Sequence, residues 1–180
     1  MGRQRQPEIA ERLLGECVAY SLEHGLPDGL EPLARSADTS VRMLLYHFGS
    51  KDDLFRAILR SARAQQLEMF GELLEVRADE RYTATLARAW RVMTSKEGQP
   101  YLRMFGQLRE NAEQQLWPGF RRVATTDWLG PLEKGWASLG RPELATVTLA
   151  VIRGLFMDLD ATADMTRVNR AFDDFLSALD

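Results

Sequence analysis

Apolar residues along this chain recur at steps of three and four, which is the spacing of one face of a helix. The first such run starts at Pro7 and stops at Gly25, and no stretch alternates polar and apolar residues as a half-buried strand does. The apolar members of this first run are Ile9, Leu13, Leu14, Cys17, Val18 and Leu22. The pattern predicts an all-α protein of about nine helices.

Polar and Gly/Pro-rich segments divide the rest of the chain. These breaks fall at 77–80, 98–100, 117–119 and 140–142. Between them we predict a long helix from Ser50 towards Val76 and shorter helices over 82–96, 100–115 and 120–139, the last with a bend at Gly130-Pro131.

The segment 44–55 joins an aromatic, His and Lys cluster to the start of the long helix. Ser50 and Asp53 have the spacing of a capping box, in which each side chain bonds the other residue's backbone N–H. Lys51 falls in the first helical turn, where the helix dipole already favours an anion. The segment therefore suggests a phosphate-binding site. An ordinary helix cap beside two buried aromatic residues would have the same sequence pattern.

The run from Leu33 to Leu45 contains a short helical stretch, a polar turn and a second short helical stretch opened by Ser40 as N-cap. Helices joined by so few residues cross steeply, which is the helix-turn-helix arrangement. We therefore expect a helix-turn-helix over about 29–48.

These residues resemble the N-terminal signature of the TetR family of bacterial transcriptional regulators. The matching stretches are Leu33-Ala34, Ala37-Asp38-Thr39-Ser40, Leu44-Leu45-Tyr46-His47-Phe48 and Gly49-Ser50-Lys51-Asp52-Asp53-Leu54. The resemblance implies a DNA-binding domain over 1–49 and a helical effector-binding and dimerisation domain over 50–180.

Three positions depart from the family pattern. Asp38 stands where a turn glycine is usual, and we expect the turn to be kept because Asp tolerates the left-handed conformation better than most residues. Leu45 replaces a tyrosine that would contact a phosphate, and Glu31 lies where a basic residue is more common. An acidic residue near the DNA backbone weakens binding.

The resemblance makes Ser40 to Tyr46 the recognition helix. Its exposed N-terminal end would carry the base-reading side chains, with Arg42 as the candidate for a bidentate guanine contact. Other side chains would hold phosphates without reading sequence. The candidate DNA-binding residues are Arg3, Arg5, Thr39, Ser40, Val41, Arg42, Tyr46, His47 and Lys51.

A net charge of −3 and a pI near 5.5 do not suggest a nucleic-acid binder. We therefore expect a local positive strip from Arg3 and Arg5 in the arm to Arg42, His47 and Lys51, doubled in a dimer, with a salt-sensitive specific complex.

Aromatic and methionine side chains concentrate between residues 90 and 136. They could line an apolar pocket for a small apolar or amphipathic effector, or they could form a packed core. The candidate pocket residues are Trp90, Met93, Tyr101, Met104, Phe105, Leu108, Trp128 and Trp136.

The last forty residues contain two amphipathic stripes, which could cover the domain's own core or form a two-fold dimer face. We prefer the dimer face, over 142–180, and Ala150–Leu155 resembles a run in the dimerising helices of TetR-type proteins. The candidate interface residues are Leu144, Val147, Val151, Gly154, Leu155, Leu159, Phe172, Phe175 and Leu179.

Other classes of protein fit the sequence less well. The two histidines, His24 and His47, have no metal-ligand spacing and no convergent acid–base set is evident, so we expect neither an enzyme nor a metal or cofactor site. The single Cys17 excludes an internal disulfide and is expected to be a buried helix residue. No apolar stretch approaches a membrane span, so we expect a cytoplasmic protein, nucleoid-associated when bound to DNA.

The sequence thus predicts a transcriptional regulator, by default a repressor, that binds a palindromic operator as a homodimer and is released by a small-molecule effector. One alternative stays open. A TetR-like dimer with weak or lost DNA binding would serve as a ligand-binding or protein-interaction module.

Overall fold

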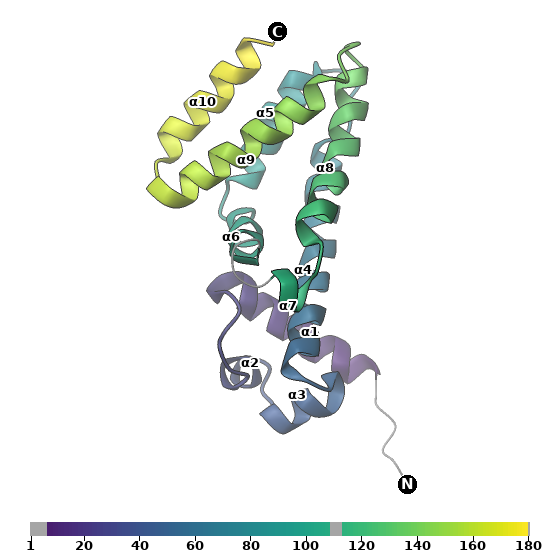
Figure 1. The fold of residues 1–180 in the computed structure, drawn as a ribbon, viewed down its shortest axis with the longest axis vertical. Helices are drawn as coiled ribbons and strands as arrows, with labels where there is room; N and C mark the ends of the chain where they lie inside the picture. Colours follow the sequence, from purple (N-terminus) through teal and green to yellow (C-terminus); the bar gives the residue numbers. More distant parts are fainter. Residues whose placement is uncertain (1–6, 109–112, 180) are drawn as a thin grey trace. The chain divides into compact units, whose positions relative to one another are not determined.

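The computed structural model describes residues 7–108 and 113–179, which form helices and no strand (Figure 1). The all-α prediction is confirmed, and within these ranges the short α7 raises the helix count to ten. None of the described helices is long and apolar enough to cross a membrane. The helices are α1 Pro7–His24, α2 Glu31–Ser36, α3 Val41–Phe48, α4 Lys51–Leu73, α5 Tyr82–Met93, α6 Gln99–Gln107, α7 Glu113–Leu116, α8 Phe120–Ala137, α9 Leu144–Thr162 and α10 Met165–Ser177.

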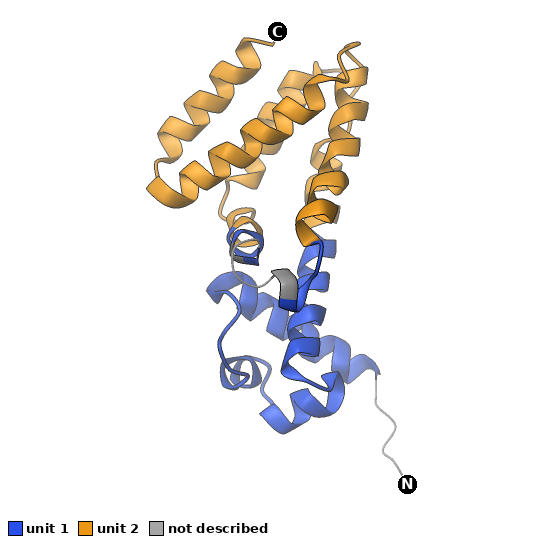
Figure 2. Cartoon of the chain, viewed as in Figure 1, with its two compact units in different colours: residues 1–65, 103–119 blue, residues 66–102, 120–180 orange. Residues whose placement is uncertain are grey.

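The chain divides into two compact units (Figure 2). Unit 1 contains residues 1–65 and 103–119, and unit 2 contains 66–102 and 120–180. This division differs from the domain boundary expected at residue 49. The first part of α4 belongs with α1 to α3, because its apolar face, including Leu54 and Ile58, is fully buried in unit 1.

The core of unit 1 is built from the stripes that the sequence predicts. Leu13 and Cys17 of α1, Leu33 of α2 and Leu44 of α3 are at most 1% exposed. Burial, with a smaller contribution from the charge of Glu16, raises the pKa of the Cys17 thiol to about 11. Cys17 is therefore the buried helix residue that the sequence predicts.

Two tryptophans organise the core of unit 2. Trp90 of α5 stacks on Phe156 of α9 and on Phe172 of α10, with ring centroids 5.0 and 4.6 Å apart, and its indole N–H donates to Asn169 Oδ1 at 2.8 Å. These contacts tie three helices together through one side chain. They also satisfy the only polar atom of that side chain, as a buried indole requires.

Trp136 of α8 forms the second centre of unit 2. Its indole N–H donates to Thr148 Oγ1 of α9 at 2.9 Å, and its ring meets the ring of Tyr82 edge-on at 5.6 Å. Gly135 leaves room for Tyr82, since a Cβ at this position would overlap the phenol ring. The close approach of α5 and α8 therefore depends on a glycine in the middle of a helix.

We expect Gly135→Ala to lower the free energy of unfolding by at least about 1–3 kcal/mol, the usual effect of overpacking a core. Gly71→Ala in α4, which lies in the same unit, is the matched control, because a Cβ there meets no atom within 4 Å outside its chain neighbours and its own helix backbone. Alanine favours the helix, so the control should be neutral or up to about 1 kcal/mol more stable. Urea denaturation followed by circular dichroism measures both, and equal stability of the two variants would contradict the role of Gly135.

Candidate nucleic-acid interface

The turn between α2 and α3 has the geometry of a helix-turn-helix. Asp38 adopts the left-handed conformation, with φ 48°, and the backbone N–H of Thr39 donates to the Ala34 carbonyl at 2.9 Å. The expectation that Asp38 keeps the turn usually made by glycine is confirmed. Asp is one of the few residues that reach this region at modest cost.

The start of α3 is fixed by a side-chain cap. Ser40 is extended, with φ −104° and ψ 155°, and its hydroxyl oxygen accepts a hydrogen bond from the Met43 backbone N–H at 3.2 Å. The helix ends at Gly49, which has φ 91° and donates its N–H to the Leu45 carbonyl at 2.8 Å. The predicted N-cap is therefore confirmed, and α3 has defined ends.

The side chains of α3 separate into a buried and an exposed set. Leu44 is fully buried, whereas Arg42, Met43, Leu45 and Tyr46 are exposed. Among the other predicted base-contacting residues, Ser40 is exposed and Thr39 and Val41 are half-buried. Arg3 and Arg5 lie outside the described residues.

His47 does not occupy the position expected of a phosphate ligand. Its side chain is 8% exposed and its ring meets that of Tyr46 edge-on at 5.1 Å. Neither ring nitrogen has a hydrogen-bond partner among the described residues. The prediction that His47 holds a phosphate is corrected, because the helical spacing from Leu44 turns both side chains towards the interior.

Lys51 lies at the predicted place, in the first turn of α4, and has an internal partner. Its ammonium donates to the Asp28 carbonyl at 2.6 Å and lies 5.4 Å from the centre of the Phe55 ring. In this structure the Lys51 side chain therefore bonds the segment that connects α1 to α2. A phosphate would have to compete with that carbonyl for the same ammonium.

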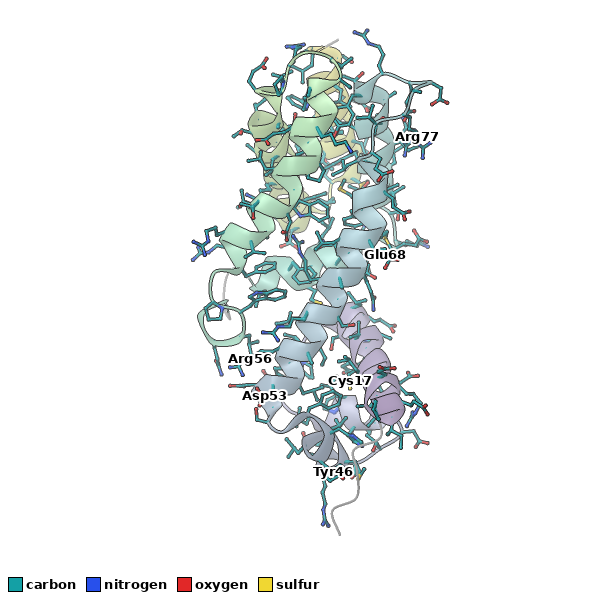
Figure 3. The ribbon with its side chains drawn as sticks, turned by 90° about the vertical axis from the view of Figure 1, so that its right-hand side faces the viewer. Cys17, Tyr46, Asp53, Arg56, Glu68 and Arg77 are labelled. Carbon is teal, nitrogen blue, oxygen red and sulfur yellow. The ribbon has the colours of Figure 1, made fainter. Side chains whose placement is uncertain are left out.

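The capping box at the start of α4 is present. The Asp53 backbone N–H donates to Ser50 Oγ at 3.1 Å, and the Ser50 hydroxyl donates to the Asp53 carboxylate at 2.6 Å. The pKa of Asp53 lies below its ordinary value, because the carboxylate accepts bonds from the Ser50 hydroxyl, Arg56 and the Ser50 backbone. Arg56 bonds this carboxylate at 2.9 Å, and Figure 3 shows the two side chains at the lower end of α4.

The segment before Gly119 returns to this capping box within unit 1. The Gln115 side-chain amide donates to the Asp52 carboxylate at 3.2 Å, and the Gln115 carbonyl accepts from Arg56 at 3.2 Å. Sequence reasoning does not find this contact, because 63 residues separate Gln115 from Asp52. We call Asp52, Arg56 and Gln115 the α4–α7 contact.

The predicted effector residues fall into both units. Met104, Phe105 and Leu108 are buried in unit 1, whereas Trp90, Met93, Tyr101, Trp128 and Trp136 belong to unit 2. Trp90 and Trp136 have the packing roles described above. These two tryptophans therefore belong to a packed core, which is the alternative to an effector pocket that the sequence left open.

Three aromatic rings of unit 2 form a separate group. Phe70 of α4 lies 6.1 Å from Tyr101 and 6.2 Å from Trp128, between ring centroids. Trp128 is half-buried, so this group reaches the surface of unit 2. Phe70 was not among the predicted effector residues, because its helical spacing is equally that of a core position.

The predicted dimer face is only partly exposed. Val147 is 43% and Met157 is 69% exposed, Gly154 is exposed and Val151 is half-buried, all on α9. Leu144, Leu155, Leu159, Phe175 and Leu179 are half-buried. The prediction that Phe172 lies in the dimer interface is corrected. This side chain is fully buried against Trp90 and has no surface to offer a partner.

Within the described ranges, no group of three or more His, Cys, Asp or Glu side chains is arranged to hold a metal ion. The α2–α3 region has the geometry of a helix-turn-helix. Its second helix, α3, is capped at Ser40 and carries the exposed cation Arg42.

Comparison with known proteins agrees with this geometry. Residues 23–58, which contain α2 and α3, match the family model described as bacterial regulatory proteins, tetR family. A comparison with curated protein sequences gives no match.

Solved structures share the fold over nearly the whole chain. A transcriptional regulator from Rhodococcus sp. Rha1 has a TM-score of 0.74 at 19% identity, with 94% of each chain covered. The multidrug binding protein EbrR complexed with ethidium has a TM-score of 0.66 at 20% identity, over 94% of this chain and 99% of EbrR. The SmeT–triclosan complex has a TM-score of 0.66 at 16% identity, over 95% of this chain and 91% of SmeT.

The matched segment contains the turn at Asp38, the cap at Ser40 and the first turn of α4. Residues 23–58 are thus similar to the DNA-binding segment of the tetR family of bacterial regulatory proteins, and the chain as a whole shares its fold with solved transcriptional regulators.

Proposed function

We propose that this protein is a homodimeric repressor of transcription, rather than an enzyme, that binds a palindromic operator and is released by a small apolar or amphipathic effector. The observation that carries the proposal is α3, which has fixed ends and an exposed face with Arg42 near its N-terminus. Two such helices, related by a two-fold axis, would read half-sites about one DNA turn, or about 34 Å, apart. The protein would act in the cytoplasm, on the nucleoid.

The division of the chain supports a route for the effector signal. α4 begins in unit 1 beside α3 and continues into unit 2, and residues 103–119 return to unit 1. The α4–α7 contact joins this returning segment to the first turn of α4. An effector that favours one arrangement of α4 would shift the population between DNA-binding and released states.

The aromatic group of Phe70, Tyr101 and Trp128 supports a site for the effector. Flat apolar rings with one half-buried tryptophan suit planar aromatic ligands. Structures that share the fold include EbrR with ethidium and SmeT with triclosan. We therefore place the effector of this chain in the class of aromatic, largely apolar molecules.

A partly exposed apolar strip on α9 supports the homodimer. Val147, Val151, Gly154 and Met157 follow one another at steps of three and four, and the small Gly154 permits close helix approach. A second copy would bury this strip in an isologous interface. It would also place two copies of α3 on one DNA molecule.

The operator can be found by selection from random double-stranded DNA, and we expect the selected sequence to be a palindrome. Arg42→Ala should lose discrimination of about 1–3 kcal/mol at one base pair of each half-site, because it removes a base contact. Lys51→Ala should weaken all variants alike and reduce the salt dependence. Fluorescence anisotropy on operator variants at fixed salt measures both.

Equal losses on every variant for Arg42→Ala would remove its base-reading role. A folded dimer that retards no DNA at low salt would instead support the alternative, a module that has lost DNA binding. This alternative is favoured by the hydrogen bond between the Lys51 ammonium and the Asp28 carbonyl, because that bond competes with a DNA phosphate.

For the dimer, we expect the double variant Val147→Glu, Met157→Glu to sediment as a monomer and the unchanged protein as a dimer. Two carboxylates on each copy would face each other across the two-fold axis. Val76→Glu is the control, because Val76 is a similarly exposed valine of unit 2 that lies outside α9. A double variant that remains dimeric in sedimentation velocity would place the interface elsewhere.

For the effector, ethidium should bind the protein alone and quench its tryptophan fluorescence. Trp128→Ala should weaken this binding about tenfold, through loss of a stacking partner worth about 1.4 kcal/mol. Trp117→Ala, which changes a tryptophan of unit 1, should leave the affinity unchanged. Unchanged ethidium affinity in Trp128→Ala would place the effector site away from this aromatic group. Triclosan, tested separately in the anisotropy assay, should release the protein from the operator.

A further inference from the structure

The outer face of α3 is unusually apolar for a surface that would meet DNA. Met43, Leu45 and Tyr46, on this eight-residue helix, are 40%, 38% and 40% exposed. They are among the few large apolar side chains exposed in the described part of the chain. Arg42 lies on the same face, three residues before Leu45.

The core of unit 1 does not account for these side chains. The buried positions of α3 are Leu44 and His47, which are 0% and 8% exposed. Met43 and Leu45 flank Leu44, and each leaves more than a third of its surface open to solvent. Their exposed apolar surface can therefore contact a molecule outside unit 1.

Most of the described cations near α3 have contacts within unit 1, and the Arg12 guanidinium donates to the Ala37 carbonyl in the turn at 3.4 Å. Lys51 is bonded to the Asp28 carbonyl, and His47 is buried beside Tyr46. Arg42 and Arg35 are the exposed cations of α2 and α3. Phosphate contacts position a helix without reading sequence, so the selectivity of α3 would come from base edges or from DNA shape.

We propose that Leu45, which shares the exposed face of α3 with Arg42 and Tyr46, contacts a thymine methyl group in the major groove, next to the guanine read by Arg42. The C5-methyl of thymine is the one apolar group that the major groove presents, and apolar side chains are its natural partners. The cap at Ser40 fixes the register of these side chains along the helix. This inference rests on the proposed binding of DNA.

Duplex DNA suits this face better than a protein partner does. The apolar set is small and is bordered by Arg42 and Ser40, both exposed and polar. A groove that presents thymine methyls beside guanine acceptors matches a face of mixed apolar and cationic character. The selected half-site should therefore contain a thymine adjacent to the guanine.

The test replaces each thymine of the selected operator by deoxyuridine, which removes the methyl and keeps the base-pairing groups. Deoxyuridine at the contacted position of one half-site should weaken binding about fourfold, the effect of losing one buried methyl-sized group, and about sixteenfold when both half-sites carry it. Leu45→Ala should bind the thymine and deoxyuridine operators with equal affinity. Leu45→Met, which keeps an apolar side chain, should restore the preference for thymine.

Two control variants separate this role from others. Ile9→Ala changes a side chain of α1 that is 37% exposed, and it should keep the fourfold preference. Arg42→Ala should change discrimination at guanine and leave the preference for thymine. Circular dichroism and the sedimentation coefficient should match the unchanged protein in every case.

The outcomes are distinct. If the protein selects an operator but every deoxyuridine substitution is neutral, or if Leu45→Ala keeps the preference, the methyl contact is wrong and the proposed function stands. If no DNA is selected or retarded at low salt, both fail, and the apolar face of α3 would then be a surface for a protein partner.

Discussion

The turn at Asp38 and the cap at Ser40 determine what the outer face of α3 can do. The left-handed backbone at Asp38 ends the α2 segment, and the Ser40 hydroxyl sets the first residue of α3. A start displaced by one residue would rotate every side chain of α3 by about 100°. Leu44 would then leave the core, and Arg42 would no longer share a face with Leu45 and Tyr46.

The chain passes between the two units three times, at residues 65/66, 102/103 and 119/120. α4 belongs to both units, and residues 103–119 come back to unit 1 after α5. The polar α4–α7 contact is exposed and made of single hydrogen bonds, so each bond contributes little to stability. Weak, reversible contacts of this kind suit a segment that must take two positions, as the proposed release of DNA requires.

Much of the fold follows from local rules, because helix caps, breaks and apolar stripes depend on neighbouring residues. The stripe of α1, the cap at Ser40 and the capping box at Ser50 all appear as the sequence predicts. The contacts of Lys51 with Asp28 and of Gln115 with Asp52 do not, because each joins residues far apart in the sequence. The roles of His47 and Phe172 changed for a related reason: their helical spacing fits both a surface and an interior position, and tertiary packing makes the choice.

The single cysteine bears on what kind of signal this protein can sense. Cys17 is fully buried in α1, and its pKa of about 11 leaves only about one molecule in ten thousand as thiolate near pH 7. Oxidants and electrophiles react with the thiolate, so this side chain is chemically inert while the unit stays folded. Oxidation of Cys17 would therefore require unit 1 to open first, so this side chain responds to unfolding rather than to oxidants around the folded protein.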